Sequence, residues 1–210
     1  MAEPLIAQLI SSQPDFPKPI LRAARATYKI RRTARMGSGM FAKCKLKPGD
    51  LVLAERPVLV YPNHFLGDHN AAFETALEYM TAEDRIAYRK LASSAPIVAP
   101  GAGDLVRIAT TNCFQMPPDI PGGSNDRYSI GDYRAMYLVT SRINHSCSPN
   151  TIADFHYPTF SFVIRATREI WKGEEITTMY AGIDGPKAER QARLAFCMDA
   201  CGCTVCNDPA

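Results

Sequence analysis

Four cysteines lie within ten residues near the C-terminal end: Cys197, Cys201, Cys203 and Cys206. Thiolates at C-x-C-x-x-C spacing can converge on one metal ion without strain, and structural zinc takes four ligands in a tetrahedron. The last three cysteines supply three ligands, so the fourth is either Cys197 or a cysteine far upstream. A structural zinc site is favoured over incidental thiols in a frayed terminus. It is also favoured over an iron–sulfur cluster, which uses longer C-x₂-C and C-x₄-C runs.

The composition is that of a globular protein, with 46% hydrophobic and 21% charged residues in 210. This length predicts one large domain, or one domain with a small appendage. Collagen, coiled-coil, disordered and knottin-like architectures are excluded. There are 24 Lys and Arg against 21 Asp and Glu, a net charge of +3. Such a small excess gives no strong nucleic-acid signal.

The chain contains no apolar run of the roughly 18 residues that a membrane helix needs. Its first residues include Glu3 and an apolar stretch of only about six residues, whereas a secretory signal has a basic start and about 7–15 apolar residues. We therefore expect an intracellular location, in the nucleus or the cytoplasm, and no membrane partner. In a reducing compartment cysteines are free or metal-bound rather than paired as disulfides.

Two stretches in the first half have clear local patterns. A strand-like run covers residues 51–61 after the turn at 48–50, and Pro57 predicts that it is split into two short strands. Residues 70–92 have helical periodicity, with Thr81 and Asp84 resembling a capping box that begins a second helix. Residues 93–104 and 117–125 are rich in Pro and Gly and predict loops.

The second half turns from helical to strand-like patterns. Residues 105–116 predict a helix or a strand. A second helix, ending near residue 143, is predicted from the helical spacing of Tyr133, Met136, Tyr137 and Thr140. Alternation over residues 160–165 and the run at 175–180 predict strands. Pro186 begins a last helix with a Glu189–Arg193 pair. Short strands interspersed with a few helices indicate the α+β class.

The segment from Ser141 to Asn150 carries the densest group of polar side chains, among them Asn144, His145 and Cys147. An Asn-His pair alone is typical of a helix cap or of a hydrogen-bonded core histidine. Three further features favour a functional site instead. They are a Gly-Ser-Gly turn upstream, a tyrosine at a strand end downstream, and the C-terminal cysteines.

Together these motifs resemble the SET-domain protein lysine methyltransferases. The matching stretches are 36–42, 142–150, 173–180 and 201–206, in the family order, and residues 111–114 resemble the SMYD-type and fungal branch. The resemblance implies a SET-domain β-clip of several small sheets with a helical insert. It also implies three regions: an N-terminal tail or helix at 1–28, a SET domain at 29–184 with its insert at about 62–110, and a post-SET helix and zinc-binding segment at 185–210.

The resemblance implies transfer of a methyl group from S-adenosylmethionine to a lysine amine of a protein substrate, histone or non-histone. Tyr180 would be the catalytic tyrosine. Cofactor contacts would come from Gly37, Ser38, Gly39, Met40, Phe41, Asn112, Asn144 and His145. One structural Zn²⁺ would be held by Cys147, Cys201, Cys203 and Cys206, with Cys197 as the competing fourth ligand. We expect a monomer.

Two features depart from the family pattern. Residues 61–112 contain no cysteine, so the MYND zinc module of the SMYD branch is absent there. Asp199 stands where family members often carry an aromatic residue, and the nearest aromatic is Phe196. Cys44 and Cys113 are predicted to be small buried apolar residues. The alternatives are a catalytically silent SET domain that binds proteins, and a zinc-stabilised interaction protein unrelated to methylation.

Overall fold

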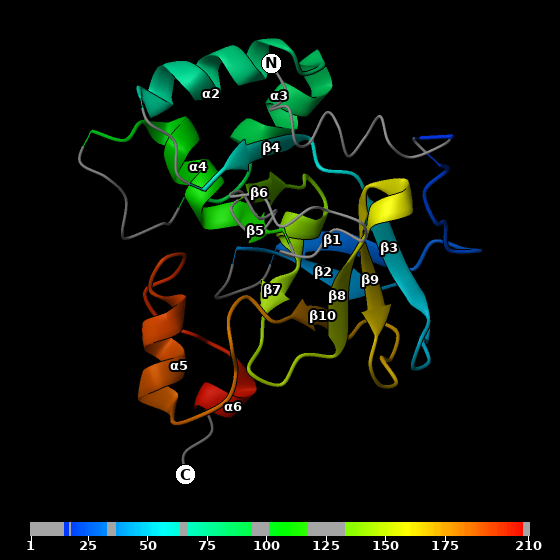
Figure 1. The fold of residues 1–210 in the computed structure, drawn as a ribbon. Coiled ribbons are helices and arrows are strands. Elements are labelled where there is room, and N and C mark those ends of the chain that lie inside the picture. Colours follow the sequence, from blue (N-terminus) through cyan, green and yellow to red (C-terminus); the bar gives the residue numbers. More distant parts are fainter. Residues whose placement is uncertain are drawn as a thin grey trace, which may run out of the picture.

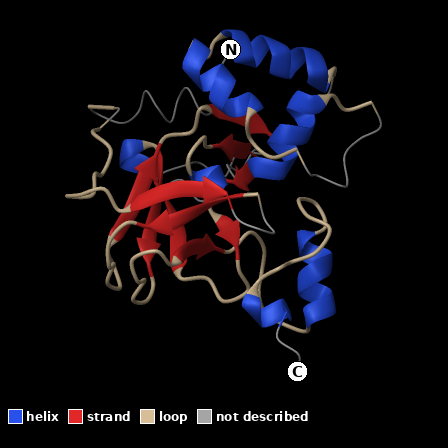
Figure 2. Ribbon diagram, turned by 180° about the vertical axis from the view of Figure 1, so that it is seen from behind, coloured by secondary structure: helices blue, strands red, loops and turns tan. Residues whose placement is uncertain are grey.

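The computed structural model describes residues 15–16, 18–32, 37–63, 67–93, 101–116 and 133–207. Most of the predicted N-terminal tail, Met36 and the predicted loop at 117–125 lie outside these ranges. The described residues form three small β-sheets and five α-helices, which is the predicted α+β class (Figures 1 and 2). The predicted region boundaries at residues 28 and 184 stay predictions.

A four-stranded sheet brings together segments that are far apart in the sequence. Its order is β1-β2-β10-β7, antiparallel except for the parallel pair β10 and β7. β2 carries the end of the Gly-Ser-Gly turn, β7 is the Asn-His pair, and β10 leads directly to Tyr180. The strands are β1 (Tyr28–Arg32), β2 (Ser38–Ala42), β7 (Asn144–His145) and β10 (Glu175–Thr178).

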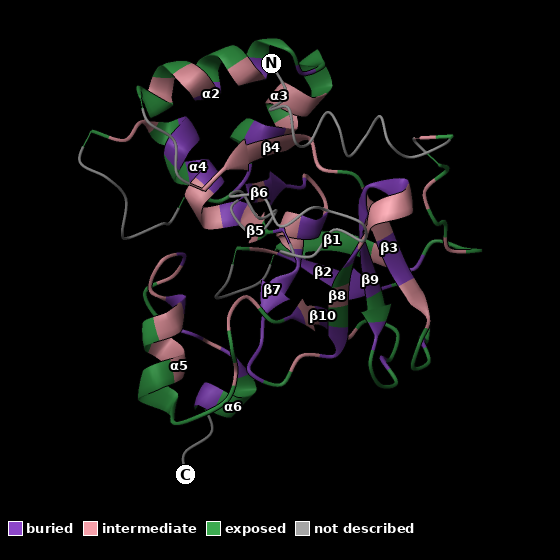
Figure 3. Ribbon diagram, in the orientation of Figure 1, coloured by how far each residue is buried: buried purple, intermediate pink, exposed green. Residues whose placement is uncertain are grey.

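Two three-stranded sheets complete the β structure, with orders β3-β9-β8 and β4-β6-β5. The main apolar core includes Met40 of the first sheet, Ile164 of the second and Ala135 of the third, all fully buried. Figure 3 shows buried residues in strands of all three sheets. The strands are β3 (Leu51–Glu55), β4 (Leu59–Pro62), β5 (Cys113–Gln115), β6 (Tyr133–Met136), β8 (Thr151–His156) and β9 (Ser161–Ala166).

The predicted break in the first strand-like run is confirmed. β3 ends at Glu55, and β4 begins at Leu59 and pairs in a different sheet. Pro57 lies between them, where its missing N–H breaks no ladder. The turn before β3 is also confirmed, because Gly49 has φ +85° and the Asp50 N–H donates to the Lys47 carbonyl at 3.0 Å.

A helical layer packs against the sheet β4-β6-β5 and has its own apolar cluster (Figure 1). It comprises α2 (His69–Glu78), α3 (Ala82–Arg89) and α4 (Asp104–Asn112). The helical prediction for 70–92 is confirmed, including the new start at Thr81, whose Oγ1 accepts the Asp84 N–H at 3.1 Å. Residues 105–116, predicted to be a helix or a strand, form first a helix and then a strand, because α4 is followed directly by β5.

The helix predicted to end near Ile143 is wrong. Residues 133–136 form β6, the central strand of its sheet, which pairs with β4 on one side and β5 on the other. Tyr133, Ala135 and Met136 are all buried. A strand buried on both faces loses the polar alternation that would identify it, and its apolar spacing can match a helical period by chance. Only the short 3₁₀ turn η2 (Thr140–Arg142) follows.

The C-terminal residues form a separate small cluster below the main core (Figure 1). α5 (Lys187–Leu194) begins after Pro186, and the predicted Glu189–Arg193 pair is confirmed at 3.4 Å. α6 (Thr204–Asn207) contains the last cysteine. A second 3₁₀ turn, η3 (Tyr157–Thr159), joins β8 to β9. None of the helices in the described ranges is long and apolar enough to cross a membrane.

Candidate functional site

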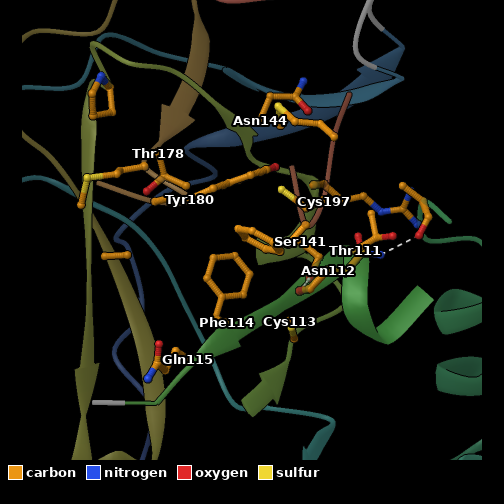
Figure 4. Close-up of a pocket in the computed structure, with 18 of the residues that line it drawn as sticks. Thr111, Asn112, Cys113, Phe114, Gln115, Ser141, Asn144, Thr178, Tyr180 and Cys197 are labelled. Carbon is orange, nitrogen blue, oxygen red and sulfur yellow. Dashed lines mark hydrogen bonds between the residues drawn. The ribbon is translucent and has the colours of Figure 1, made fainter. Parts of the chain in front are cut away.

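One cavity of about 1280 Å³ lies where the sheets, the helical layer and the C-terminal segment meet (Figure 4). Five of the predicted site residues line it: Gly37, Ser38, Asn112, Asn144 and Tyr180. They come from the β1–β2 connection, the end of α4, β7 and the residues after β10. The cavity therefore depends on the tertiary fold and not on any single local motif.

The Gly-Ser-Gly turn begins at the cavity and ends in the buried interior. Gly37 and Ser38 line the cavity, whereas Gly39 is buried. Gly37 has φ +70°, and no heavy atom lies within 4 Å of the position a Cβ would take. A side chain there would be strained and would project into open space. Gly39, Met40 and Phe41 are buried behind the cavity wall, and Arg31 covers the Phe41 ring at 3.6 Å. These three predicted residues do not line the cavity.

Asn112 is held rigidly at the end of α4. Its side-chain Nδ2 donates to the carbonyls of Ala92 and Ile108, both at 2.7 Å. Its backbone carbonyl accepts the Ser141 hydroxyl at 3.1 Å. With both amide hydrogens used, the Asn112 Oδ1 has no donor among the described residues. It can accept a hydrogen bond from a ligand in the cavity.

Asn144 and His145 lie side by side on β7 but face different surroundings. The Asn144 Nδ2 donates to the Glu175 carboxylate at 2.7 Å, which holds the Asn144 side chain against β10 at the cavity wall. His145 is 2% exposed and does not line the cavity. Its Nδ1 accepts the Tyr180 backbone N–H at 3.1 Å, so Nε2 carries the proton and faces the Cys147 Sγ at 3.4 Å. Burial lowers the pKa of His145 to about 4, which keeps the ring neutral.

Tyr180 is fixed by its backbone, its ring and its hydroxyl. The ring centroid lies 5.4 Å from that of His145, and the hydroxyl donates to the Ile143 carbonyl at 2.6 Å. Burial, with smaller effects of Cys197 and Glu175, raises the pKa of the phenol. The side chain therefore stays protonated at neutral pH. It presents a neutral oxygen to the cavity, and not a phenolate.

Four buried thiols gather beside this wall. The Sγ atoms of Cys147, Cys201, Cys203 and Cys206 all lie within 4.8 Å of one another. Those of Cys147 and Cys206 are 3.6 Å apart. A tetrahedral zinc with Zn–S bonds of 2.3 Å would place its sulfur atoms about 3.8 Å apart. The cluster therefore has the composition and spacing of a structural zinc site.

Hydrogen-bond donors surround these sulfurs, as an anionic metal–thiolate centre requires. The Cys147 N–H donates to the Cys203 Sγ at 3.4 Å, and the Arg190 guanidinium donates to the Cys206 Sγ at 3.7 Å. Burial opposes ionisation of Cys203, but the donors around it lower its pKa to about 7. The Cys201 N–H donates to the Gln191 side chain at 2.8 Å, which fixes α5 against the cluster.

Cys197 lies outside the group of four. Its Sγ donates to the Leu194 carbonyl at 3.4 Å, and its side chain lines the cavity. Burial and the nearby Cys113 raise the pKa of the Cys197 thiol to about 12. Of the two candidates for a fourth ligand, the structure brings Cys147 to the three terminal cysteines.

The other predicted thiols differ from expectation. Cys44 and Cys113 are half-buried, not buried. Cys113 lines the cavity, and its Sγ accepts the Arg134 Nη1 at 3.1 Å. An apolar sequence context did not reveal that an arginine of the adjacent strand β6 reaches this sulfur.

Sequence reasoning missed Glu55, the last residue of β3. Its carboxylate accepts the backbone N–H groups of Leu138, Val139 and Thr140 at 2.7–2.9 Å, and the Thr140 hydroxyl at 2.7 Å. It therefore fixes the turn that leads into β7. The available signal was an acidic residue at the end of an otherwise apolar strand. Sequence reasoning also assigned no role to Arg142, which lines the cavity.

Comparison with known proteins agrees with this geometry. Residues 37–181, more than half of the chain, match the family described as the SET domain. The small sheets, the Asn-His strand beside a cavity-lining tyrosine and the cysteine cluster all lie in or beside that region. The chain therefore belongs to the SET-domain family.

The relatives are named as methyltransferases or SET-domain proteins. Histone-lysine N-methyltransferase set5 of Schizosaccharomyces pombe is 29% identical over 182 residues, which cover 86% of this chain and 50% of that protein. SET domain-containing protein SmydA-8 of Drosophila melanogaster is 32% identical over 105 residues, 50% of this chain and 21% of that protein. Mouse histone-lysine N-methyltransferase SMYD3 is 37% identical over 74 residues, which cover 34% of this chain and 17% of that protein. The chain thus spans half the length, or less, of these relatives.

A crystal structure from Plasmodium falciparum, of a protein described as a histone methyltransferase, aligns with a TM-score of 0.41 at 13% identity. The alignment covers 74% of this chain and 94% of that one.

Proposed function

We propose that this chain transfers a methyl group from S-adenosylmethionine to the side-chain amine of a lysine in a protein substrate. One observation carries the proposal. Residues from four distant segments, including Gly37, Asn112, Asn144 and Tyr180, line a single cavity of about 1280 Å³. That volume exceeds the range of roughly 300–1,000 Å³ typical of one small-molecule site. It is large enough for a nucleoside-sized donor together with a lysine side chain.

The residues present fit the cofactor. S-Adenosylmethionine supplies a methyl group activated on a sulfonium. Gly37 offers backbone without a side chain, the Asn112 Oδ1 offers an acceptor, and Asn144 offers a fixed polar side chain. Phe196 lines the same cavity beside Asp199. Its ring supplies an aromatic surface close to the position where family members often carry one.

The substrate amine has to be neutral to act as a nucleophile, whereas a lysine in water has a pKa of about 10.4. Apolar surroundings favour the neutral form. Phe114, Phe162 and Ile183 supply apolar lining to the cavity that Tyr180 also lines. Because the Tyr180 hydroxyl proton is directed to the Ile143 carbonyl, its oxygen is left as an acceptor that can orient the amine. Alignment of this kind is the main contribution a protein makes to a displacement at a methyl carbon.

The four clustered cysteines would hold a structural zinc ion. Such an ion would connect the loop after β7 to the C-terminal segment, which contributes Phe196 and Asp199 to the cavity wall. The Nε2 of His145, 3.4 Å from the Cys147 Sγ, then links the metal centre to the backbone of Tyr180. The zinc would have no chemical role in the transfer.

Ligand-dependent thermal melting tests the cofactor part of the proposal. S-Adenosylhomocysteine at 100 times its dissociation constant adds about 2.7 kcal/mol of stability. For a chain of this size that raises the melting temperature by about 5–10 °C. No shift would contradict cofactor binding and would favour a zinc-stabilised interaction protein.

A transfer assay with labelled S-adenosylmethionine and a protein array tests the reaction. Tyr180→Phe is expected to lower transfer at least about 100-fold, within the range that a positioned catalytic group contributes. It should leave the melting shift unchanged. Tyr79→Phe is the matched control, because Tyr79 is 86% exposed and outside the cavity lining. A melting shift without any transfer in the unaltered chain would favour the silent binding module.

A further inference from the structure

We propose that Arg142 is the anion-recognition residue of the cavity and binds a carboxylate of the bound ligand. The inference rests on the proposed function, because the ligand is the methyl donor or the lysine-bearing substrate. Either can supply the carboxylate. S-Adenosylmethionine carries one on its amino-acid end, and an Asp or Glu beside the target lysine carries another.

The charges that line the cavity favour an anionic group. Lys90, Arg134 and Arg142 line it, against a single acid, Asp199, among the described lining residues. The sulfonium of the donor and the amine of the substrate are both cationic when they enter. A cationic lining opposes such ligands unless an anionic group on one of them meets one of the cations.

The three cations differ in their partners. Arg134 donates from Nε to the Asn63 Oδ1 at 2.6 Å and from Nη1 to the Cys113 Sγ at 3.1 Å. Lys90 is exposed at the end of α3. Arg142 is half-buried, and within the described ranges its guanidinium has neither a hydrogen bond nor an ion pair. Burial lowers its pKa without any opposing carboxylate.

A partly desolvated guanidinium without acceptors is unfavourable, and a carboxylate relieves this best. The planar fork of arginine pairs two N–H donors with two carboxylate oxygens. Arg142 is therefore the half-buried lining cation whose guanidinium can take a carboxylate from the ligand without giving up a contact within the described ranges. Arg142 lines the cavity together with Asn144, which lies two residues further along the chain.

The backbone of Arg142 is already held in place. Arg142 is the last residue of η2, and its N–H donates to the Val139 carbonyl at 2.9 Å. Glu55 fixes the residues before it, and the Ser141 hydroxyl ties the turn to the Asn112 carbonyl at 3.1 Å. A preorganised position reduces the entropy lost on binding. The backbone of Arg142 is thus fixed in a turn that Ser141 ties to Asn112.

Calorimetric binding of S-adenosylhomocysteine and of its decarboxylated analogue tests the cofactor as the source of the carboxylate. The variants are Arg142→Gln, Arg142→Lys and the control Arg107→Gln, since Arg107 is exposed on α4 and outside the cavity lining. If the cofactor carboxylate is bound, its removal weakens binding to the unaltered chain about 10- to 100-fold. Arg142→Gln then weakens S-adenosylhomocysteine binding by a similar factor, and leaves the analogue unaffected. Arg142→Lys recovers part of the loss.

A lysine-centred peptide library, with Glu or Gln at each flanking position, tests the substrate as the source. In that case the unaltered chain methylates at least one Glu-containing set about tenfold or more faster than its Gln counterpart. Arg142→Gln removes this preference and leaves S-adenosylhomocysteine binding unchanged.

The melting temperature of Arg142→Gln shows whether the variant is folded. The inference is overturned if the folded variant keeps both the preference for S-adenosylhomocysteine over its decarboxylated analogue and the preference for Glu-containing over Gln-containing peptides. It is equally overturned if the variant weakens S-adenosylhomocysteine and the decarboxylated analogue by the same factor, because the carboxylate is then not what Arg142 recognises. Absence of S-adenosylhomocysteine binding by the unaltered chain is a different result. It contradicts the proposed function itself, and this inference with it.

Discussion

His145 is the residue that joins the cavity to the cysteine cluster. Its two ring nitrogens have separate partners, the Tyr180 N–H on one side and the Cys147 Sγ on the other. Burial keeps the ring neutral, so a fixed tautomer with the proton on Nε2 satisfies both contacts. The Asn-His pair thus has divided roles. Asn144 faces the cavity, and His145 supports the wall from behind.

The choice between Cys147 and Cys197 as fourth zinc ligand gives a prediction for single residues. Cys147→Ser is expected to lose bound zinc, because it removes one thiolate of the group of four. Cys197→Ser should retain one zinc per chain, because its Sγ faces the Leu194 carbonyl instead. Elemental analysis of the purified variants measures the difference. Zinc retained in Cys147→Ser, or lost in Cys197→Ser, would show that the ligand set is wrong.

The aromatic surface that we propose for Phe196 at the cofactor can be tested by truncation. Phe196→Ala is expected to weaken S-adenosylhomocysteine binding about tenfold, since stacking of a base on an aromatic ring contributes about 1–3 kcal/mol. Calorimetry measures the change. Trp171→Ala is the control, an aromatic residue that is 58% exposed and outside the cavity lining. Equal effects of both substitutions would argue against a stacking role for Phe196.

The sequence predicted residues with distinctive spacing better than residues whose role depends on tertiary contacts. The spacing of the C-terminal cysteines predicted a metal centre, and the family resemblance implied cofactor contacts from Asn144 and His145, of which Asn144 lines the cavity. Glu55 and Arg142 belong to no such pattern. Glu55 accepts hydrogen bonds from a turn more than 80 residues away, and the role proposed for Arg142 rests on its having no acceptor among the described residues. Neither property can be read from neighbouring residues.

At the scale of elements, β3 positions the site through its last residue. Glu55→Gln is expected to lower the free energy of unfolding by about 2–3 kcal/mol, because a neutral amide replaces the carboxylate that accepts charge-assisted hydrogen bonds from several backbone N–H groups. Urea unfolding monitored by circular dichroism measures this. Glu78→Gln, at an exposed position on α2, is expected to change stability by less than about 0.5 kcal/mol. Matching effects would contradict a specific role for the Glu55 contacts.

Elements with local signals were predicted, and those defined by pairing were not. The break between α2 and α3 was predictable because Thr81 and Asp84 form their contacts within one turn. The strand β6 was mistaken for a helix because only its two neighbours in the sheet decide its conformation. Its partners β4 and β5 lie on either side in space, and 18 or more residues away in sequence. No short sequence window contains that information.

At the scale of the whole molecule, the cysteine cluster joins the SET-matching region to the C-terminal segment. Cys147 comes from the loop after β7, and the other three cysteines follow α5. The same C-terminal segment supplies Phe196 and Asp199 to the cavity. Metal binding should therefore stabilise both this segment and the cavity wall, because a site assembled only in the folded state contributes its binding energy to folding.

Zinc removal then has a regional effect that hydrogen exchange can resolve. A strong chelator is expected to remove amide protection from α5 and α6 and to weaken S-adenosylhomocysteine binding. Amides of β3, β9 and β8 should stay protected, since their core includes fully buried Ile164 and does not include the cysteine cluster. Restored zinc should recover both properties. Loss of protection that is uniform over the chain would mean that the metal supports the whole fold, whereas unchanged ligand binding would separate the metal centre from the cavity.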